Sequence, residues 1–216
     1  MPPDAAPGVL LVHGLWMRSI AMRWLATRLR SQGFAPTTFG YYSLLQDTDA
    51  VVARLAGVLA AHPGIHVVAH SLGGLLTLRA VERLGDAAIG RIVCLGSPLA
   101  GSGAAAAIAA RIPAGAQLVG HNRALLQAGI GRIPDGIEAG MVAGCVPRGL
   151  GGLVARFDGP HDGTVSVAET RVPGLADHVV VRASHSGLLF SDEVVRQVAG
   201  FLRGDGFEHA VEPPAV

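Results

Sequence analysis

Short apolar segments alternate with longer amphipathic segments along most of the chain. The apolar segments are rich in Val, Ile and Leu and are bounded by turn residues, which is typical of strands buried on both faces of a parallel sheet. This alternation predicts an α/β fold in which a compact, roughly six-stranded, mostly parallel sheet carries helices on both faces. The pattern predicts strands over residues 9–13, 35–39, 65–69, 91–95, 137–144 and 179–183, and helices over residues 20–31, 48–61, 72–84 and 192–202.

The segment after the fourth predicted strand differs from this pattern. Residues 101–135 are rich in Ala and Gly and contain two short helical patterns, over residues 104–111 and 122–128. Two interpretations stay open for this segment, a small lid or surface helices. We expect a flexible tail over residues 204–216. Because no internal repeat or long linker divides the chain, we expect a single domain, residues 1–216.

The composition excludes several classes of partner and chemistry. The chain has 17 basic and 16 acidic side chains and a formal net charge of +1, so no broad electric field favours nucleic acid or an anionic membrane. Every Lys or Arg position is an Arg, which excludes a Schiff-base lysine and the lysine of a phosphate-binding P-loop. Cys94 and Cys145 lack C-x-x-C spacing, and we expect them to be buried, reduced thiols.

The start of the chain shows neither the basic nor the apolar region of an export signal. The longest run of small apolar residues, 104–110, is shorter than the roughly 20 residues that cross a bilayer. We therefore expect a cytoplasmic protein without a transmembrane segment.

Residues 69–74, Ala-His-Ser-Leu-Gly-Gly, join the third predicted strand to the following helix. Because the turn is so short, its middle residue, Ser71, is expected to adopt a strained backbone conformation that exposes the hydroxyl. The small side chains of Ala69 and Gly73 suit the close packing of such a turn. We expect Ser71 to be a nucleophile and His70 to point away from it as packing or polar support. The alternative is a glycine-rich turn that packs closely or holds a phosphate.

A serine nucleophile needs a histidine base and a carboxylate that orients the histidine. His185 is the best candidate for the base because it follows the last predicted strand in a loop of small residues. The other histidines after Ser71 are less well placed: His178 at the opposite end of its strand, His121 in the possible lid, His161 beside a candidate acid and His209 in the tail. Two candidates for the acid, Asp158 and Asp162, share the loop after the fifth predicted strand.

Several of these segments resemble motifs of the α/β-hydrolase superfamily, in particular its small bacterial lipases and esterases. Residues 69–74 resemble the nucleophile elbow G-x-S-x-G, with Ala69 in place of the first Gly. His13 and Gly14 resemble the His-Gly motif of lipases, although an ordinary turn with a satisfied histidine is the alternative. The resemblance implies an oxyanion hole made by the backbone N–H groups of Leu15 and Leu72.

Two further segments fit the same resemblance. Residues 159–165 resemble the D-G-x-V loop that carries the acid in lipases, which favours Asp162 over Asp158. Residues 95–102 resemble a Pro-x-x-Gly-Ser/Thr loop found near lipase pockets. The resemblance also places His185 at the position of the catalytic base. The chain starts directly at the strand before His13, as in compact lipases, and this likeness implies a fold without a large cap domain.

The resemblance implies a carboxylic ester hydrolase that acts on small-molecule or lipid acyl esters through Ser71, Asp162 and His185. It implies substrate contacts near His13, Gly14 and Trp16, and it requires no metal and no organic cofactor. Two alternatives stay open. One is a thioesterase or acyltransferase with the same triad, and the other is a non-catalytic binding protein with a hydrolase fold.

Overall fold

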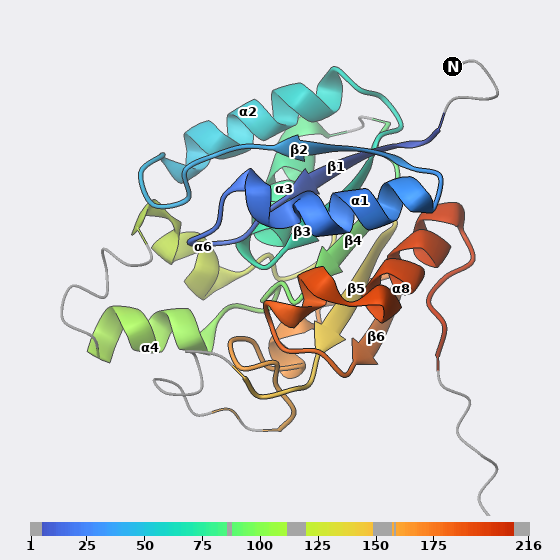
Figure 1. Ribbon diagram of the computed structural model, residues 1–216. Coiled ribbons are helices and arrows are strands. Elements are labelled where there is room, and N and C mark those ends of the chain that lie inside the picture. Colours follow the sequence, from blue (N-terminus) through green and yellow to red (C-terminus); the bar gives the residue numbers. More distant parts are fainter. Residues whose placement is uncertain (1–5, 86–87, 112–119, 149–156, 158, 210–216) are drawn as a thin grey trace, which may run out of the picture.

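Six parallel strands form one sheet in the computed structural model of the chain (Figure 1). The structure describes residues 6–85, 88–111, 120–148, 157 and 159–209. The order across the sheet is β2-β1-β3-β4-β5-β6, and every neighbouring pair is parallel. The predicted α/β class and the six-stranded parallel sheet are therefore confirmed. The strands are β1 (Gly8–Val12), β2 (Ala35–Phe39), β3 (His66–His70), β4 (Ile92–Leu95), β5 (Ala139–Gly144) and β6 (Asp177–Val181).

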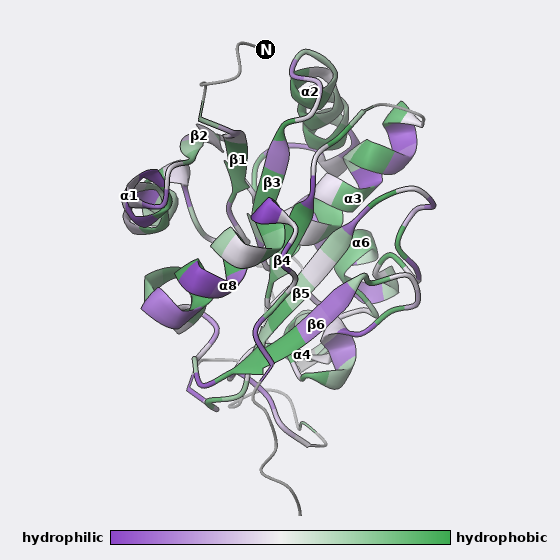
Figure 2. Cartoon of the chain, turned by 90° about the vertical axis from the view of Figure 1, so that its right-hand side faces the viewer, coloured by the Kyte–Doolittle hydropathy of each residue, from purple (hydrophilic) through white to green (hydrophobic). Residues whose placement is uncertain are grey.

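Helices cover both faces of this sheet. Figure 2 views the sheet from its side, with α1 and α8 on one face and α3 and α6 on the other. The described parts of the connections also contain short 3₁₀ helices, namely η1 (Ser19–Met22), η2 (Gly120–Asn122), η3 (Ala168–Thr170) and η4 (Gly187–Phe190). The α-helices are α1 (Arg23–Ser31), α2 (Thr48–Ala60), α3 (Leu72–Leu84), α4 (Gly103–Arg111), α6 (Arg123–Ala128) and α8 (Asp192–Arg203).

Two apolar clusters hold the layers together, one on each face of the sheet. In β1, Val9 and Leu11 belong to the cluster under α1 and α8, whereas Leu10 and Val12 belong to the cluster under α2 and α3. Side chains alternate between the faces of a strand, so a strand covered on both sides needs apolar residues at consecutive positions. This requirement explains the continuous apolar runs in the sequence.

The direction in which the chain crosses the sheet changes beside β1. From β1 the chain moves to β2 on one side, and it then returns to β3 on the other side. The carboxyl ends of β1 and β3 lie side by side there, with Val12 paired with Ala69. In open α/β sheets this crevice is the usual position of a ligand site.

The last strand begins earlier than the sequence predicts. The predicted strand covers residues 179–183, but β6 runs from Asp177 to Val181. The polar residues Asp177 and His178 pair with β5. At the other end, the N–H of Ala183 donates to the carbonyl of Val181 in a local turn, so the strand ends there. The ends of the other strands agree with the prediction to within two residues.

The start of the segment expected to be a flexible tail, residues 204–209, contacts the rest of the fold. Phe207 is buried, its ring lies 4.8 Å from that of Phe201, and its N–H donates to the Asp177 carboxylate over 2.8 Å. The side-chain amide of Gln197 also pairs with the backbone of Glu208. Residues 204–209 therefore pack against α8 and β6, because Phe207 has an apolar site to fill. Residues 210–216 lie outside the described residues.

The structure also bears on the predictions for the cysteines, for a membrane span and for a cap domain. Both cysteines are free, but only Cys94 is buried, while Cys145 is partly exposed. Within the described ranges, no helix combines the length and the apolar character that spanning a bilayer requires. In the same ranges the chain between β4 and β5 adds only α4, η2 and α6, and no large cap covers the sheet.

We expect Phe207→Ala to lower the free energy of unfolding by about 3 kcal/mol, because it empties an apolar site beside Phe201. Urea denaturation measures this loss. Phe190→Ala is a matched control, since that ring is 56% exposed, and its effect should stay below about 1 kcal/mol. Equal losses in the two variants would contradict the docking of residues 204–209.

Candidate active site

The chain reverses direction sharply at Ser71, between the end of β3 at His70 and the start of α3 at Leu72. Ser71 has φ 55° and ψ −124°, a conformation that residues other than glycine rarely adopt. The turn brings α3 close to the end of β1: a Cβ on Gly73 would lie 2.6 Å from the carbonyl oxygen of Val12 and 2.7 Å from that of His13. The tight, strained turn predicted from the sequence is thus present, and Gly73 allows it.

His185 lies within hydrogen-bond distance of Ser71. It follows β6 in the loop before η4, and its Nε2 is 3.0 Å from the Ser71 Oγ. The backbone N–H of His185 also donates to the carbonyl of Asp162 over 2.9 Å, which fixes the loop. The predicted base therefore lies beside the predicted nucleophile.

Asp162 completes the chain of contacts behind His185. Its carboxylate is 1% exposed, and Oδ2 accepts a hydrogen bond from the His185 Nδ1 over 2.7 Å. Oδ1 accepts from the backbone N–H groups of Thr164, over 2.9 Å, and Val165, over 2.7 Å. Because Nδ1 carries the proton toward Asp162, Nε2 is left to accept the Ser71 hydroxyl proton. The rival acid, Asp158, lies outside the described residues.

Two glycines allow the backbone to approach this pair. Gly96 has φ +55°, and a Cβ there would lie 3.0 Å from the Asp162 Oδ2 and 3.2 Å from the His185 Nδ1. A Cβ on Gly144 would lie 2.9 Å from the Asp162 Cβ. The ends of β4 and β5 therefore form the surface against which the aspartate and histidine pack, and a larger residue would displace them.

His70 gives the polar support expected of it, but it also lines the cavity beside Ser71 and does not lie clear of it. Its ring centroid lies 4.7 Å from that of His185, and its Nε2 donates to the backbone carbonyl of His185 over 3.0 Å. Burial, followed by the neighbouring charge of His185, lowers the pKa of His70 to about 3. His70 is therefore a neutral support under the His185 loop, a contact between distant residues that no local sequence pattern indicates.

The turn after β1 lies beside Ser71. His13 is buried and stacks on Tyr41 with ring centroids 4.2 Å apart, and burial lowers its pKa. A Cβ on Gly14 would lie 2.9 Å from the Ser71 Cβ, so a side chain there would collide with the sharp turn. Trp16 has φ 59° and is half-exposed. Of the three residues predicted to contact substrate, only Trp16 lines the cavity described next.

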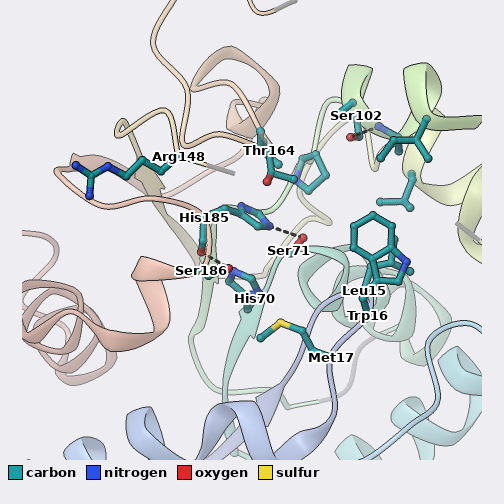
Figure 3. Close-up of a pocket in the computed structure, with 16 residues that line it drawn as sticks. Leu15, Trp16, Met17, His70, Ser71, Ser102, Arg148, Thr164, His185 and Ser186 are labelled. Carbon is teal, nitrogen blue, oxygen red and sulfur yellow. Dashed lines mark hydrogen bonds between the residues drawn. The ribbon is translucent and has the colours of Figure 1, made fainter. Parts of the chain in front are cut away.

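A cavity of about 340 Å³ opens beside the Ser71 hydroxyl. Figure 3 shows Ser71 and His185 joined at its centre, with Leu15 and Trp16 on one side and Thr164 on the other. Most of the wall is apolar, and α4 and α6 contribute part of it. The lining residues are Leu15, Trp16, Met17, His70, Ser71, Pro98, Ser102, Ala104, Ala105, Ile108, Leu126, Arg148, Thr164, Val165, His185 and Ser186.

Three other histidines that follow Ser71 in the sequence have partners outside this cavity. His178 contacts the Thr170 hydroxyl over 2.9 Å, and His209 contacts Asp177 over 2.8 Å. The His161 Nδ1 accepts from the N–H of Gly163 and orders the loop that carries Asp162. These contacts give each ring a structural partner.

We expect Gly96→Ala to cost about 1–3 kcal/mol more stability than a matched glycine substitution, because its Cβ meets Leu188 at 2.8 Å as well as Asp162 and His185. Gly136→Ala is the control, since Gly136 has φ +77° but no described atom within 4 Å of its Cβ position. Chemical denaturation of both variants separates the close contact from the backbone strain that they share. Similar losses would show that Gly96 is not held against the pair.

The lowered pKa of His70 predicts a loss of stability in acid. Between the ordinary value of 6.5 and about 3, the unfolded chain binds a proton at His70 and the folded chain does not. Above pH 6.5 His70 therefore costs the fold no stability. Below pH 6.5 this one group lowers the free energy of unfolding by about 1.4 kcal/mol for each pH unit. We expect His70→Gln to flatten the pH dependence of the unfolding free energy by up to this slope. An unchanged slope would contradict the neutral, buried ring.

Comparisons with known proteins agree with this architecture. A model of the alpha/beta hydrolase family matches residues 9–147, and no curated protein sequence matches the chain. The mature lipase BlEst2 of Bacillus licheniformis has a TM-score of 0.77 and 20% identity, with 94% of each chain covered. The propeptide form of that lipase has a TM-score of 0.77 and 19% identity, with 99% of this chain and 54% of that chain covered.

A monoacylglycerol lipase of Paleococcus ferrophilus has a TM-score of 0.58 and 17% identity, with 94% of this chain and 97% of that chain covered. At these identities the likeness to the solved structures concerns the fold. The family match is independent of them, extends over more than half of the sequence and includes the sharp turn at Ser71. The chain therefore belongs to the alpha/beta hydrolase family.

Proposed function

We propose that this protein is a serine hydrolase that cleaves carboxylic acyl esters through Ser71, His185 and Asp162. The proposal rests on one observation: the hydroxyl, the imidazole and the buried carboxylate form an unbroken chain of hydrogen bonds that opens onto an apolar cavity. The lipase activities named for two structural neighbours agree with this function.

In the proposed acylation step, the Ser71 Oγ attacks the carbonyl carbon of the ester while the His185 Nε2 takes the hydroxyl proton. The imidazolium that forms is stabilised by Asp162, which accepts from Nδ1. His185 then gives the proton to the leaving alkoxide, and the alcohol departs. The acyl group is left esterified to Ser71.

Water completes the reaction. His185 takes a proton from a water molecule, whose oxygen attacks the acyl carbon, and Ser71 leaves with the proton that His185 returns. The products are a carboxylic acid and the free enzyme. No group outside the protein, water and the ester is needed to balance either step.

We assign the oxyanion hole to the backbone N–H groups of Leu15 and Leu72, as the resemblance implies. Within the described residues neither N–H donates to another backbone or side-chain group, so both are available to a developing oxyanion. Leu72 begins α3, where the helix dipole also favours negative charge. Each such donor contributes roughly 3–4 kcal/mol to the transition state.

The cavity wall suggests where the acyl group binds. Ala104, Ala105 and Ile108 from α4, together with Leu126 from α6, present hydrocarbon to the cavity. These residues belong to residues 101–135, so the proposed lid, whether it moves or stays fixed, would set the length of acyl chain that fits. We propose a small-molecule or lipid ester as the substrate on this basis.

We expect Ser71→Ala to lower kcat by roughly 10⁴-fold or more on p-nitrophenyl esters, because no other described hydroxyl contacts His185 Nε2. Asp162→Asn should lower it by about 10⁴-fold, because an amide favours the wrong tautomer of His185. Steady-state assays over a series of acyl chain lengths measure both effects, and Thr27→Ala, which alters a hydroxyl bonded only within α1, serves as a control.

The same assays distinguish an ester hydrolase from the two alternative functions. Matched thioesters and alcohol acceptors, added to the series, separate an ester hydrolase from a thioesterase or acyltransferase. A fluorophosphonate that fails to label Ser71 in the folded protein would favour a non-catalytic binding protein. Loss of turnover in Asp158→Asn, with full turnover in Asp162→Asn, would move the role of the acid to Asp158.

A further inference from the structure

Three successive peptide groups of the turn after β1 are held by hydrogen bonds with side chains. The Tyr41 hydroxyl donates to the carbonyl of His13 over 2.7 Å. The His13 Nδ1 donates to the carbonyl of Gly14 over 2.9 Å. The Ser43 Oγ accepts from the N–H of Trp16 over 3.1 Å.

These bonds surround the N–H of Leu15. That N–H shares a peptide plane with the carbonyl of Gly14, and in a trans peptide the two groups point in opposite directions. The bond from His13 therefore sets the plane of the Leu15 N–H, while the bond to Ser43 fixes the next plane. The direction of the N–H depends on both.

The hydrogen bond to Ser43 stabilises a strained backbone conformation at Trp16. Trp16 and Ser71 are the only non-glycine residues with positive φ in the described chain, and a large aromatic residue at φ 59° is strained. A strained conformation persists only when its surroundings hold it. Ser43 is 5% exposed, so water has little access to replace its hydroxyl.

The backbone of Ser43 is itself held by a buried side chain. The side-chain amide of Asn122, in η2, donates to the backbone carbonyl of Ser43, and its own oxygen accepts from the Thr48 hydroxyl over 3.1 Å. Asn122 is 2% exposed. The serine hydroxyl thus has a fixed position from which to hold Trp16, and this position depends on a residue of the segment between α4 and α6.

We propose that Ser43 is a positioning residue that presets the Leu15 N–H for the oxyanion. The inference rests on the proposed function, because it assigns Leu15 to the oxyanion hole. Ser43 does not line the cavity, and it acts through the backbone of Trp16. Its effect therefore falls on the charged tetrahedral intermediate and not on the binding of the neutral ester.

The test compares Ser43→Ala with Ser43→Thr, which keeps a hydroxyl. We expect Ser43→Ala to lower kcat by about tenfold with KM changed by less than twofold, a smaller loss than the 10²–10³-fold caused by removal of a whole donor. The affinity for a trifluoromethyl ketone, which binds Ser71 as a tetrahedral oxyanion, should fall by the same factor. Ser43→Thr should recover most of both losses.

Ser191→Ala is a matched control, because the Ser191 Oγ also accepts from a backbone N–H, that of Val194, but at the start of α8. It should lower Tm by a similar amount and leave kcat unchanged. If Ser43→Ala also leaves kcat and the ketone affinity unchanged, or changes KM alone, the inference is overturned.

If Ser43→Ala does not fold, Asn122→Ala provides the second test, since it releases the carbonyl of Ser43. A smaller fall in kcat, again at constant KM, supports the inference, and an unchanged kcat overturns it. Ser71→Ala is assayed in parallel. Full turnover in that variant would reject the proposed function itself, whereas its loss together with a normal Ser43→Ala would reject only the role of Ser43.

Discussion

The parallel direction of all six strands is the constraint on which the site depends. Because parallel strands end at one edge of a sheet, the loops after β3, β5 and β6 meet there, although Ser71 and His185 are 114 positions apart in the sequence. Parallel strands must be connected by crossovers, and the helices of those crossovers cover both faces. The same arrangement that buries the sheet therefore brings the hydroxyl, imidazole and carboxylate together.

Much of the fold and of the candidate site could be predicted from the sequence, because the patterns that indicate them are local. A strand covered on both faces needs consecutive apolar residues, and a strand followed at once by a helix needs a tight turn, which identified Ser71. His185 was identified from its place after the last strand. The choice of Asp162 over Asp158 depended on a family resemblance, because the N–H groups that orient its carboxylate belong to Thr164 and Val165 in a loop of no regular period.

The features that the sequence did not reveal arise from contacts between distant residues. The ring of His70 supports a loop 115 positions away, and the hydroxyl of Ser43 holds a backbone N–H 27 positions away. The polar start of β6 and the packing of Phe207 depend on partners that no local pattern indicates. Gly96 carries no sequence signal beyond being a glycine, because its importance comes from atoms of Asp162 and His185.

The conformation of Ser71, with φ 55° and ψ −124°, has a thermodynamic consequence for the whole molecule. A non-glycine residue in such a region costs on the order of 1–3 kcal/mol, a sizeable share of the roughly 5–15 kcal/mol by which domains are stable. Glycine at this position would relieve the cost and remove the hydroxyl. The hydroxyl at this position is therefore present at a cost in stability, which the burial of the two apolar clusters must offset.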